Sequence, residues 1–280
     1  LKDDGTITGP TGTWRVCTLP SRINRSITLP KIAGLLYQMA GRVDVGTDGG
    51  FTKSSADTNV TLTIEPGVIV YGGTGVSWLA VNRGNKINAV GTATRPIIFT
   101  SRDNVLGLNT ETSQGQWGGI VLLGRAKITD CTTGSTAANT CERQTEGAAD
   151  PALFGGSDDA DSSGTMQYVQ IRYSGYVLGS NVELQSLTPS GIGSGTVLSH
   201  IQSYNSSDDG VEFFGGVPQM KYYVSVGADD DSLDVDVGAR ANFQYGIMIQ
   251  RDGAGDALME IDSNGRETEL PRTDLRISNF

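Results

Sequence analysis

The sequence is poor in histidine, cysteine and bases, and it lacks a long apolar run. His200 is the single histidine among 280 residues, which excludes a three-histidine zinc site. A membrane-spanning helix needs about 20 consecutive apolar residues, and no such stretch occurs. The 21 bases are outnumbered by 31 acids, which argues against binding to nucleic acid or anionic lipid. We therefore expect a folded protein without a transmembrane segment, whose charged partners are cationic.

Glycine, in contrast, is abundant. It accounts for 38 of the 280 residues, nearly twice the usual share of about 7%, and it follows no collagen-like triplet period. Beyond about residue 55, short apolar runs are bounded by Gly, Asn, Asp or Ser, which is typical of strands and turns. Ile32–Met39 fits either a helical face or a strand, and its flanking Pro and Gly favour a strand. The predicted strands are Val60–Tyr71, Ile97–Thr100, Gly119–Leu123, Met166–Tyr173, Val197–Tyr204, Tyr222–Val226 and Phe243–Ile249.

The C-terminal half contains an internal repeat. Asp208–Phe213 (DDGVEF) matches Asp230–Val235 (DDSLDV) at an offset of 22 residues, and each follows a predicted strand. A period near 22 is too short for a four-stranded propeller blade and suits one coil of a solenoid. We therefore predict an all-β fold, a right-handed parallel β-helix, with glycine at its corners.

The two ends of such a solenoid expose sheet edges and need caps. We expect residues 1–55 to form an N-terminal cap and residues 56–280 to form the coils of a single domain. No cap is evident after Ile261, and the chain ends at Phe280 in an extended-looking run. The C-terminal end is therefore expected to be truncated, with further coils beyond it or a partner covering it.

The three cysteines suggest one disulfide. Cys131 and Cys141 bracket a stretch rich in Thr, Ser, Gly, Ala and Asn, and closing that loop would stabilise the fold by roughly 2–3 kcal/mol. A disulfide indicates an oxidising compartment, whereas the alternative is two unrelated thiols. Cys17 is then left without a partner in this chain. Because the chain begins at Leu1, that partner is expected upstream.

Acidic residues are concentrated in the repeat region. Residues 201–280 contain 15 acids and six bases, whereas residues 1–200 contain 16 acids and 15 bases. In an apolar-acid-apolar strand the apolar pair faces the core, so the acid faces outwards. Stacking of coils would align these acids as a ladder, and unit charges about 5 Å apart repel by roughly 1 kcal/mol even in water. The acids of this predicted ladder are Glu183, Glu212, Asp234 and Glu260.

Three interpretations of these acids stay open: a solvated face that keeps the surface soluble, a cation site, and a catalytic site. Turn aspartates before the ladder add oxygens suited to calcium, which takes about six to eight oxygen ligands in loose geometry. Asp159 and Asp161 have the spacing that opens a calcium loop, but Gln170 stands where its closing Glu belongs, so only a looser site or a simple turn remains. The candidate calcium ligands are Asp209, Glu212, Asp231, Asp234, Glu260, Asp159 and Asp161.

Support for nucleophilic catalysis is weak. His200 lies in a predicted strand without a nucleophile elbow or a metalloprotease helix, so we interpret it as a structural residue rather than a base. The tryptophans and tyrosines are scattered along the chain and indicate no binding platform.

Six segments carry a family resemblance. The chain resembles a family of secreted β-helix proteins of Gram-negative bacteria, some of them outer-membrane-associated, for which no reaction is established. The resemblance implies fold and location, and hardly any activity. The matching segments are LTIEPGVIVYG (Leu62–Gly72), GTATRPIIFTS (Gly91–Ser101), GQWGGIVLLGRA (Gly115–Ala126), YVQIRYSG (Tyr168–Gly175), SSDDGVEFFGG (Ser206–Gly216) and ADDDSLDVDVG (Ala228–Gly238).

Two functions are compatible with these observations. The first is a secreted or cell-surface protein without enzymatic activity that binds cations, glycans or other surface components through its acidic faces and turns. The second, by analogy of fold, is a polysaccharide lyase or glycoside hydrolase. Its working carboxylates would be Asp208, Asp209, Asp230 and Asp231, with a base among Arg172, Lys221 and Arg251. The oligomeric state stays open.

Overall fold

The computed structural model describes residues 1–74, 76–146, 148, 150–179, 182–263 and 265–280. The chain is all-β, with 43% of residues in strands and 2% in helix, as predicted. The helical residues form α1 (Arg102–Leu106), which begins after an N-cap at Ser101 and ends at Gly107, whose positive φ closes the last turn. None of the helices in the described part of the chain is long and apolar enough to cross a membrane.

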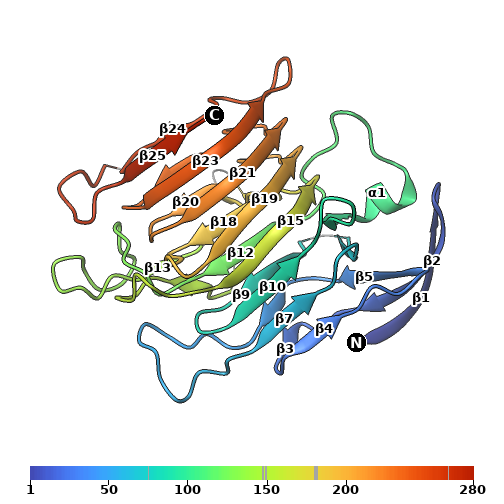
Figure 1. The fold of residues 1–280 in the computed structure, drawn as a ribbon, viewed down its shortest axis with the longest axis horizontal. Coiled ribbons are helices and arrows are strands. Elements are labelled where there is room, and N and C mark those ends of the chain that lie inside the picture. Colours follow the sequence, from blue (N-terminus) through green and yellow to red (C-terminus); the bar gives the residue numbers. More distant parts are fainter. Residues whose placement is uncertain (75, 147, 149, 180–181, 264) are drawn as a thin grey trace.

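The strands form two large sheets, which we call sheet A and sheet B, and they stand in a single long stack (Figure 1). Sheet A contains β1 (Lys2–Gly9), β2 (Gly12–Thr18), β4 (Ile27–Leu29), β5 (Leu35–Met39), β7 (Thr61–Ile64), β8 (Ile69–Gly72), β10 (Lys86–Val90), β11 (Ile97–Ser101), β15 (Gly164–Arg172), β19 (Val197–Tyr204), β21 (Gln219–Val226), β23 (Arg240–Ile249) and β25 (Asp274–Ser278). Sheet B contains β3 (Arg22–Ile23), β6 (Val43–Val45), β9 (Trp78–Val81), β12 (Gly119–Leu123), β18 (Leu187–Ser190), β20 (Glu212–Phe214), β22 (Asp234–Asp236) and β24 (Glu260–Ile261). Two short antiparallel pairs lie outside these sheets: β13 (Arg143–Gln144) with β14 (Leu153–Phe154), and β16 (Val177–Gly179) with β17 (Val182–Glu183).

Strands far apart in sequence pair in parallel, which identifies a β-helix. In sheet B, β12 pairs with β9 and with β18, and β20 pairs with β22, each in parallel register. In this register, residues of similar type lie next to one another on neighbouring strands. One column that faces the core contains Leu79, Ile120 and Leu187. All three are buried in the main core between the sheets, where stacked aliphatic side chains exclude water.

The later strands of sheet A bend in the middle. β10 pairs with the first half of β15, up to Gln167, whereas β11 pairs with its second half, from Val169 to Ile171. The bend occurs at Tyr168, which has a positive φ. Each coil therefore has three sides, namely sheet B and the two halves of sheet A.

A long insertion between β12 and β15 covers part of the outer face of sheet B. Its side chains Ile128, Cys141 and Phe154 pack against outward-facing Val121 and Leu123 in a second hydrophobic cluster. The predicted disulfide between Cys131 and Cys141 is confirmed within this insertion, with 5.1 Å between the Cα atoms. Cys17 is a free thiol on β2.

Residues 1–55, expected as a cap, contribute strands to the same two sheets. β2 pairs with β5, and β3 pairs with β6, in parallel. The antiparallel pairing of β1 with β2 stands at the edge of sheet A. At the other end of the stack, β25 pairs in parallel with β23 and β24 pairs with β22 (Figure 1).

Candidate functional site: an acidic pocket on sheet B

The central part of the predicted acid ladder is present on sheet B. Glu212 lies in register with Asp234, and Asp234 lies in register with Glu260. The residues that flank the first two acids face inwards and are fully buried: Val211, Phe213, Leu233 and Val235. The period-two alternation therefore places the three acids in one column on the outer face, at the spacing of about 4.8 Å between neighbouring strands.

Glu183 does not belong to this column, contrary to expectation. It lies on β17, which pairs antiparallel with β16 as a short hairpin inserted before β18. The insertion shifts the register, so that Thr188 occupies the position next to Glu212, as the parallel bridge between Leu187 and Val211 indicates. Glu183 instead forms part of the pocket wall that faces the ladder.

The turn aspartates are also stacked. Asp209 Oδ1 accepts a hydrogen bond from the backbone N–H of Asp231 at 2.8 Å. Asp231 Oδ1 accepts one in the same way from Ala257 at 2.7 Å. Asp208 accepts a hydrogen bond from the Gln185 amide at 3.0 Å. These bonds hold consecutive turns together and fix the carboxyls at the edge of the ladder.

Ladder, turns and insertion together enclose a pocket of about 170 Å³. Within each of two groups, one oxygen from every carboxylate lies within 4.8 Å of the others: Asp208 with Asp209 and Asp230, and Asp209 with Glu212 and Asp234. Asp230, Asp231 and Asp256 form a third such group beside the pocket. The pocket is lined by Glu146, Glu183, Gln185, Asp208, Asp209, Glu212, Asp230 and Asp234.

Glu212 is the most buried of the lining carboxyl residues that accept no hydrogen bond in the described structure. It is only 7% exposed, because the insertion and the β16–β17 hairpin cover this part of sheet B. No hydrogen bond or salt bridge from any described residue reaches its carboxyl. Asp234 Oδ1 is likewise buried without a hydrogen-bond partner in the described structure. Leaving a buried carboxyl unsatisfied costs about 1–3 kcal/mol or more, so these groups are destabilising as they stand.

Burial and mutual repulsion raise the pKa values of the cluster. Burial is the main reason that the pKa of Asp231 is raised to about 6, those of Asp208 and Asp236 to about 7, and that of Asp234 to about 8. The pKa values of Asp209 and Glu212 lie well above the usual range, first through burial and then through the negative charges of neighbouring carboxyls. The cluster therefore retains protons near neutral pH unless a cation takes their place.

A paired acid lies further along the same column. Asp44 stands in register with Ala80 on β9, and Ala80 with Val121 on β12. It is as buried as Glu212, at 8% exposed. Yet Asp44 accepts hydrogen bonds from Arg42 at 2.8 Å and from the Asn82 amide at 3.0 Å. The fold thus supplies partners to a buried acid in one part of the column and none to Glu212.

Asp159 and Asp161, predicted as ligands of a looser cation site, lie in the insertion away from this pocket. Asp159 forms a bidentate ion pair with Arg240 at 2.8 and 2.9 Å. Asp161 Oδ2 accepts a hydrogen bond from the backbone N–H of Arg125 at 2.9 Å. Both carboxylates are therefore engaged by groups of the chain itself.

The bases considered for a lyase reaction do not line the acidic pocket. Lys221 lies on β21 and Arg172 on β15, both in sheet A, where Arg172 packs over the rings of Tyr173 and Tyr204. Arg251 donates to the Gln114 side chain at 2.5 Å. A proton-abstracting Lys or Arg is thus missing among the described residues that line the pocket.

The donor set fits a hard cation that prefers oxygen. Seven carboxyls and one amide surround the pocket, and calcium takes about six to eight oxygen ligands in irregular geometry. The buried, unpartnered carboxyl of Glu212 points to a ligand of opposite charge. The described residues of the lining include neither histidine nor cysteine, which would favour zinc.

Two lining residues could not be identified from the sequence. Glu146 lies in the insertion, and burial raises the pKa of its carboxyl. Gln185 precedes β18 and donates to Asp208. Neither belongs to the repeat, and only the folding of the insertion and the hairpin over sheet B brings them to the ladder.

Comparison with known proteins gives one match. The model of a family described as a pectate-lyase-like beta helix domain matches residues 51–280. The match confirms the right-handed β-helix type that the sequence motifs predicted. No curated protein and no solved structure matches the chain.

Proposed function

The chain belongs to the pectate-lyase-like β-helix family, and from that premise we propose that it is a carbohydrate-related surface protein that binds a divalent cation, calcium, in its acidic pocket. In this proposal the protein is not an enzyme, and the cation completes a site that the chain alone leaves unsatisfied. The single observation that carries the proposal is Glu212, a buried carboxyl without a partner in the described structure, enclosed by other carboxyls.

The ion would sit between Asp209, Glu212 and Asp234, whose oxygens already lie within 4.8 Å of one another. Asp208 and Asp230 border the same space. Binding would replace the protons of these carboxyls by a positive charge and so remove the repulsion between them. Magnesium suits the pocket less well, because it demands near-octahedral geometry and keeps much of its water.

We also propose that the protein works outside the cytoplasm, on a cell surface or secreted. The disulfide between Cys131 and Cys141 supports this location, because structural disulfides persist in oxidising compartments. The partners in that setting would be glycans or other surface components.

The cation proposal is tested by thermal unfolding. At a calcium concentration about 100 times the dissociation constant, mass action stabilises the folded chain by about 2.7 kcal/mol. For a chain of this size we expect a rise in melting temperature of several degrees, since about 1 kcal/mol shifts the midpoint by roughly 2–4 °C. Equal magnesium should give a smaller rise.

Variants locate the effect. Glu212→Gln combined with Asp234→Asn should remove most of the difference between calcium and magnesium. Asp252→Asn combined with Glu267→Gln makes the same change in net charge at two exposed positions outside the pocket, and it should leave that difference intact. Equal shifts with both metals, or equal effects of the two double variants, would show that the acids form only a solvated face.

A second candidate function is a carbohydrate-active enzyme. It is favoured by the near-neutral pKa values of Asp208 and Asp231, since a general acid works best when its pKa lies near the operating pH. Asp208, Asp209, Asp230 and Asp231 would then be the working carboxylates. Incubation with acidic and neutral polysaccharides decides between the two functions: chain cleavage abolished by Asp209→Asn would establish the enzyme. Cation binding without cleavage would support the first proposal.

A further inference from the structure

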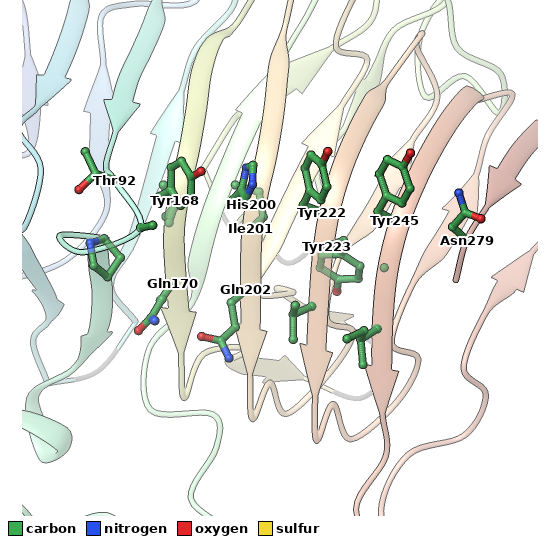
Figure 2. Close-up of a pocket in the computed structure, with 16 residues that line it drawn as sticks. Thr92, Tyr168, Gln170, His200, Ile201, Gln202, Tyr222, Tyr223, Tyr245 and Asn279 are labelled. Carbon is green, nitrogen blue, oxygen red and sulfur yellow. The ribbon is translucent and has the colours of Figure 1, made fainter.

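Four rings stand in one row on the outer face of sheet A (Figure 2). His200 stacks on Tyr168 at 4.1 Å between ring centroids and on Tyr222 at 4.4 Å. Tyr222 stacks in turn on Tyr245 at 5.0 Å, with 13° between the ring planes. Each ring comes from a successive strand, β15, β19, β21 and β23, so the row runs along the solenoid axis.

These rings occupy backbone positions that tyrosine rarely adopts. The φ angles of Tyr168, His200, Tyr222 and Tyr245 are 51°, 54°, 58° and 64°. Such left-handed positions cost an ordinary side chain about 1–3 kcal/mol each, and Asn or Gly adopts them more easily. Asn279 occupies the next position beyond Tyr245, with φ 60°. The bend of each strand therefore does not require a ring, and stacking of the rings on one another, worth about 0.5–1.5 kcal/mol per pair, offsets part of this cost.

A groove of about 510 Å³ runs beside the row. The rings form one side of it, and Gln170 and Gln202 form the other (Figure 2). Ile247 also lines the groove and lies in the same register column as these glutamines. In a chain with a net charge of -10, none of the described residues that line this groove is Asp, Glu, Lys or Arg. The groove therefore favours a neutral ligand, whereas the acidic pocket on sheet B favours a cation.

The chemistry of the two sides narrows the ligand further. Because the rings cover one another's faces, they present their edges to the groove, and their phenol hydroxyls lie at the ends of the rings that point away from Gln170 and Gln202 (Figure 2). Gln170 and Gln202 present amides, which both donate and accept. The complement of this surface is an uncharged chain with apolar C–H surface towards the rings and hydroxyls along the edge that faces the glutamines, extended over several repeats of about 4.8 Å.

We propose that this groove binds a neutral linear glycan, laid along the solenoid axis with its C–H surface against the ring edges and its hydroxyls towards the glutamine amides. The site is separate from the acidic pocket, because it lies on sheet A and the two sets of described lining residues share no member. Binding is therefore independent of the proposed cation function and should persist in a metal chelator.

The test is isothermal titration of the chain with cellohexaose in EDTA, with hexagalacturonate as the acidic comparison. Tyr222 and Ile247 are 45% and 60% exposed, so both positions tolerate substitution. Tyr222→Ala should weaken cellohexaose binding about tenfold, the equivalent of an aromatic contact of about 1.4 kcal/mol. Ile247→Glu, which introduces a charge into the groove, should weaken it at least as much. Lys221→Ala is the matched control, since Lys221 is an exposed neighbour that does not line this groove, and it should leave affinity unchanged.

Several results would overturn the proposal. One is the absence of cellohexaose binding, and another is binding that Tyr222→Ala and Ile247→Glu leave intact. A preference for hexagalacturonate in EDTA would assign the groove to an acidic ligand. A wild-type dimer in sedimentation velocity that Ile247→Glu dissociates would assign it to a second copy of the chain.

Discussion

Asp57 and Glu212 are two buried carboxyl residues, of which only Asp57 has a partner of opposite charge in the described structure. Their exposed fractions are nearly equal, at 8% and 7%. Asp57 accepts two hydrogen bonds from the guanidinium of Arg125, at 2.7 and 2.9 Å, and this partner holds the pKa of Asp57 below its usual value. Glu212 has no such partner in the described structure, and burial raises its pKa well above the usual range.

The difference follows from the distribution of bases along the chain. Asp57 and Asp44 lie among arginines in the N-terminal half, whereas Glu212 and Asp234 lie in a segment with few bases. Parallel stacking then multiplies the repulsion, because it places acid next to acid in successive coils. This unpaired ladder is the observation on which the cation proposal rests.

The largest effect is expected when Asp57 loses its partner and becomes an unpaired buried carboxylate, as Glu212 is. Arg125→Met removes the partner of a carboxylate whose side chain is 2% exposed. We expect a loss of about 3–5 kcal/mol in the free energy of unfolding, because an uncompensated charge is left buried. Urea unfolding measures this loss. Adding Asp57→Asn should recover part of it, and a loss below about 1 kcal/mol would contradict the assigned role of the pair.

The reverse change removes the unpaired charge at position 212. In metal-free protein at pH 8, Glu212→Gln should stabilise the fold by about 1–3 kcal/mol, because the folded chain no longer has to hold an unsatisfied buried carboxyl. Asp57→Asn should destabilise the fold under the same conditions. The asparagine amide would replace a carboxylate that is paired with Arg125, whereas the glutamine amide at position 212 would replace an unpaired one.

The pH dependence of the two variants should run in opposite directions. The folded pKa of Glu212 is raised, so its contribution to stability is present below the unfolded pKa of about 4.5 and is lost as pH rises through the folded value. The gain from Glu212→Gln should therefore vanish near pH 4. The folded pKa of Asp57 is lowered, so its contribution is present above about 3.8 and is lost as pH falls further. Urea unfolding of both variants between pH 3 and pH 8 measures how each change in unfolding free energy depends on pH. Dependences with reversed signs, or no dependence on pH, would refute this assignment.

The smallest expected effect concerns an exposed partner. Arg22 lies 3.8 Å from Asp44, but its side chain is 55% exposed, and Arg42 and Asn82 also serve Asp44. Arg22→Ala should therefore cost less than about 1 kcal/mol, the usual value of an exposed ion pair. A cost as large as that of Arg125→Met would mean that Asp44 depends on a single cation, and the comparison would need revision.

The fold was predictable because its signals are local and repeated. The strands Gly119–Leu123 and Val197–Tyr204 were predicted with their observed bounds, and the offset of 22 residues between Glu212 and Asp234 is the observed register of neighbouring coils. The hairpin that displaces Glu183 from the ladder was not predictable in this way. An insertion between coils breaks the period on which the prediction rests.

The sites were predictable only in part. The ladder acids were found from alternation, but the burial of Glu212 depends on an insertion whose folding over sheet B leaves no periodic signal. The sequence analysis missed the row of stacked rings on sheet A, which consists of Tyr168, His200, Tyr222 and Tyr245. These residues are 32, 22 and 23 positions apart in the sequence, so the tyrosines seem scattered. The signal was present in the segments QYVQ, SHIQ, KYYV and QYGI, where each ring precedes a position of the second half of sheet A.

The central claim, that a divalent cation completes the unpaired carboxyl cluster, is tested most directly by calcium titration calorimetry of the wild-type chain at pH 8 and at pH 5. At pH 8 we expect binding that releases protons, because the ion displaces them from Asp234, whose pKa is raised to about 8, and from Asp209 and Glu212, whose pKa values are raised well above the usual range. At pH 5 the affinity should fall, and Glu212→Gln should abolish binding at either pH. Calcium binding that is independent of pH and survives Glu212→Gln, or no binding at pH 8, would contradict the account.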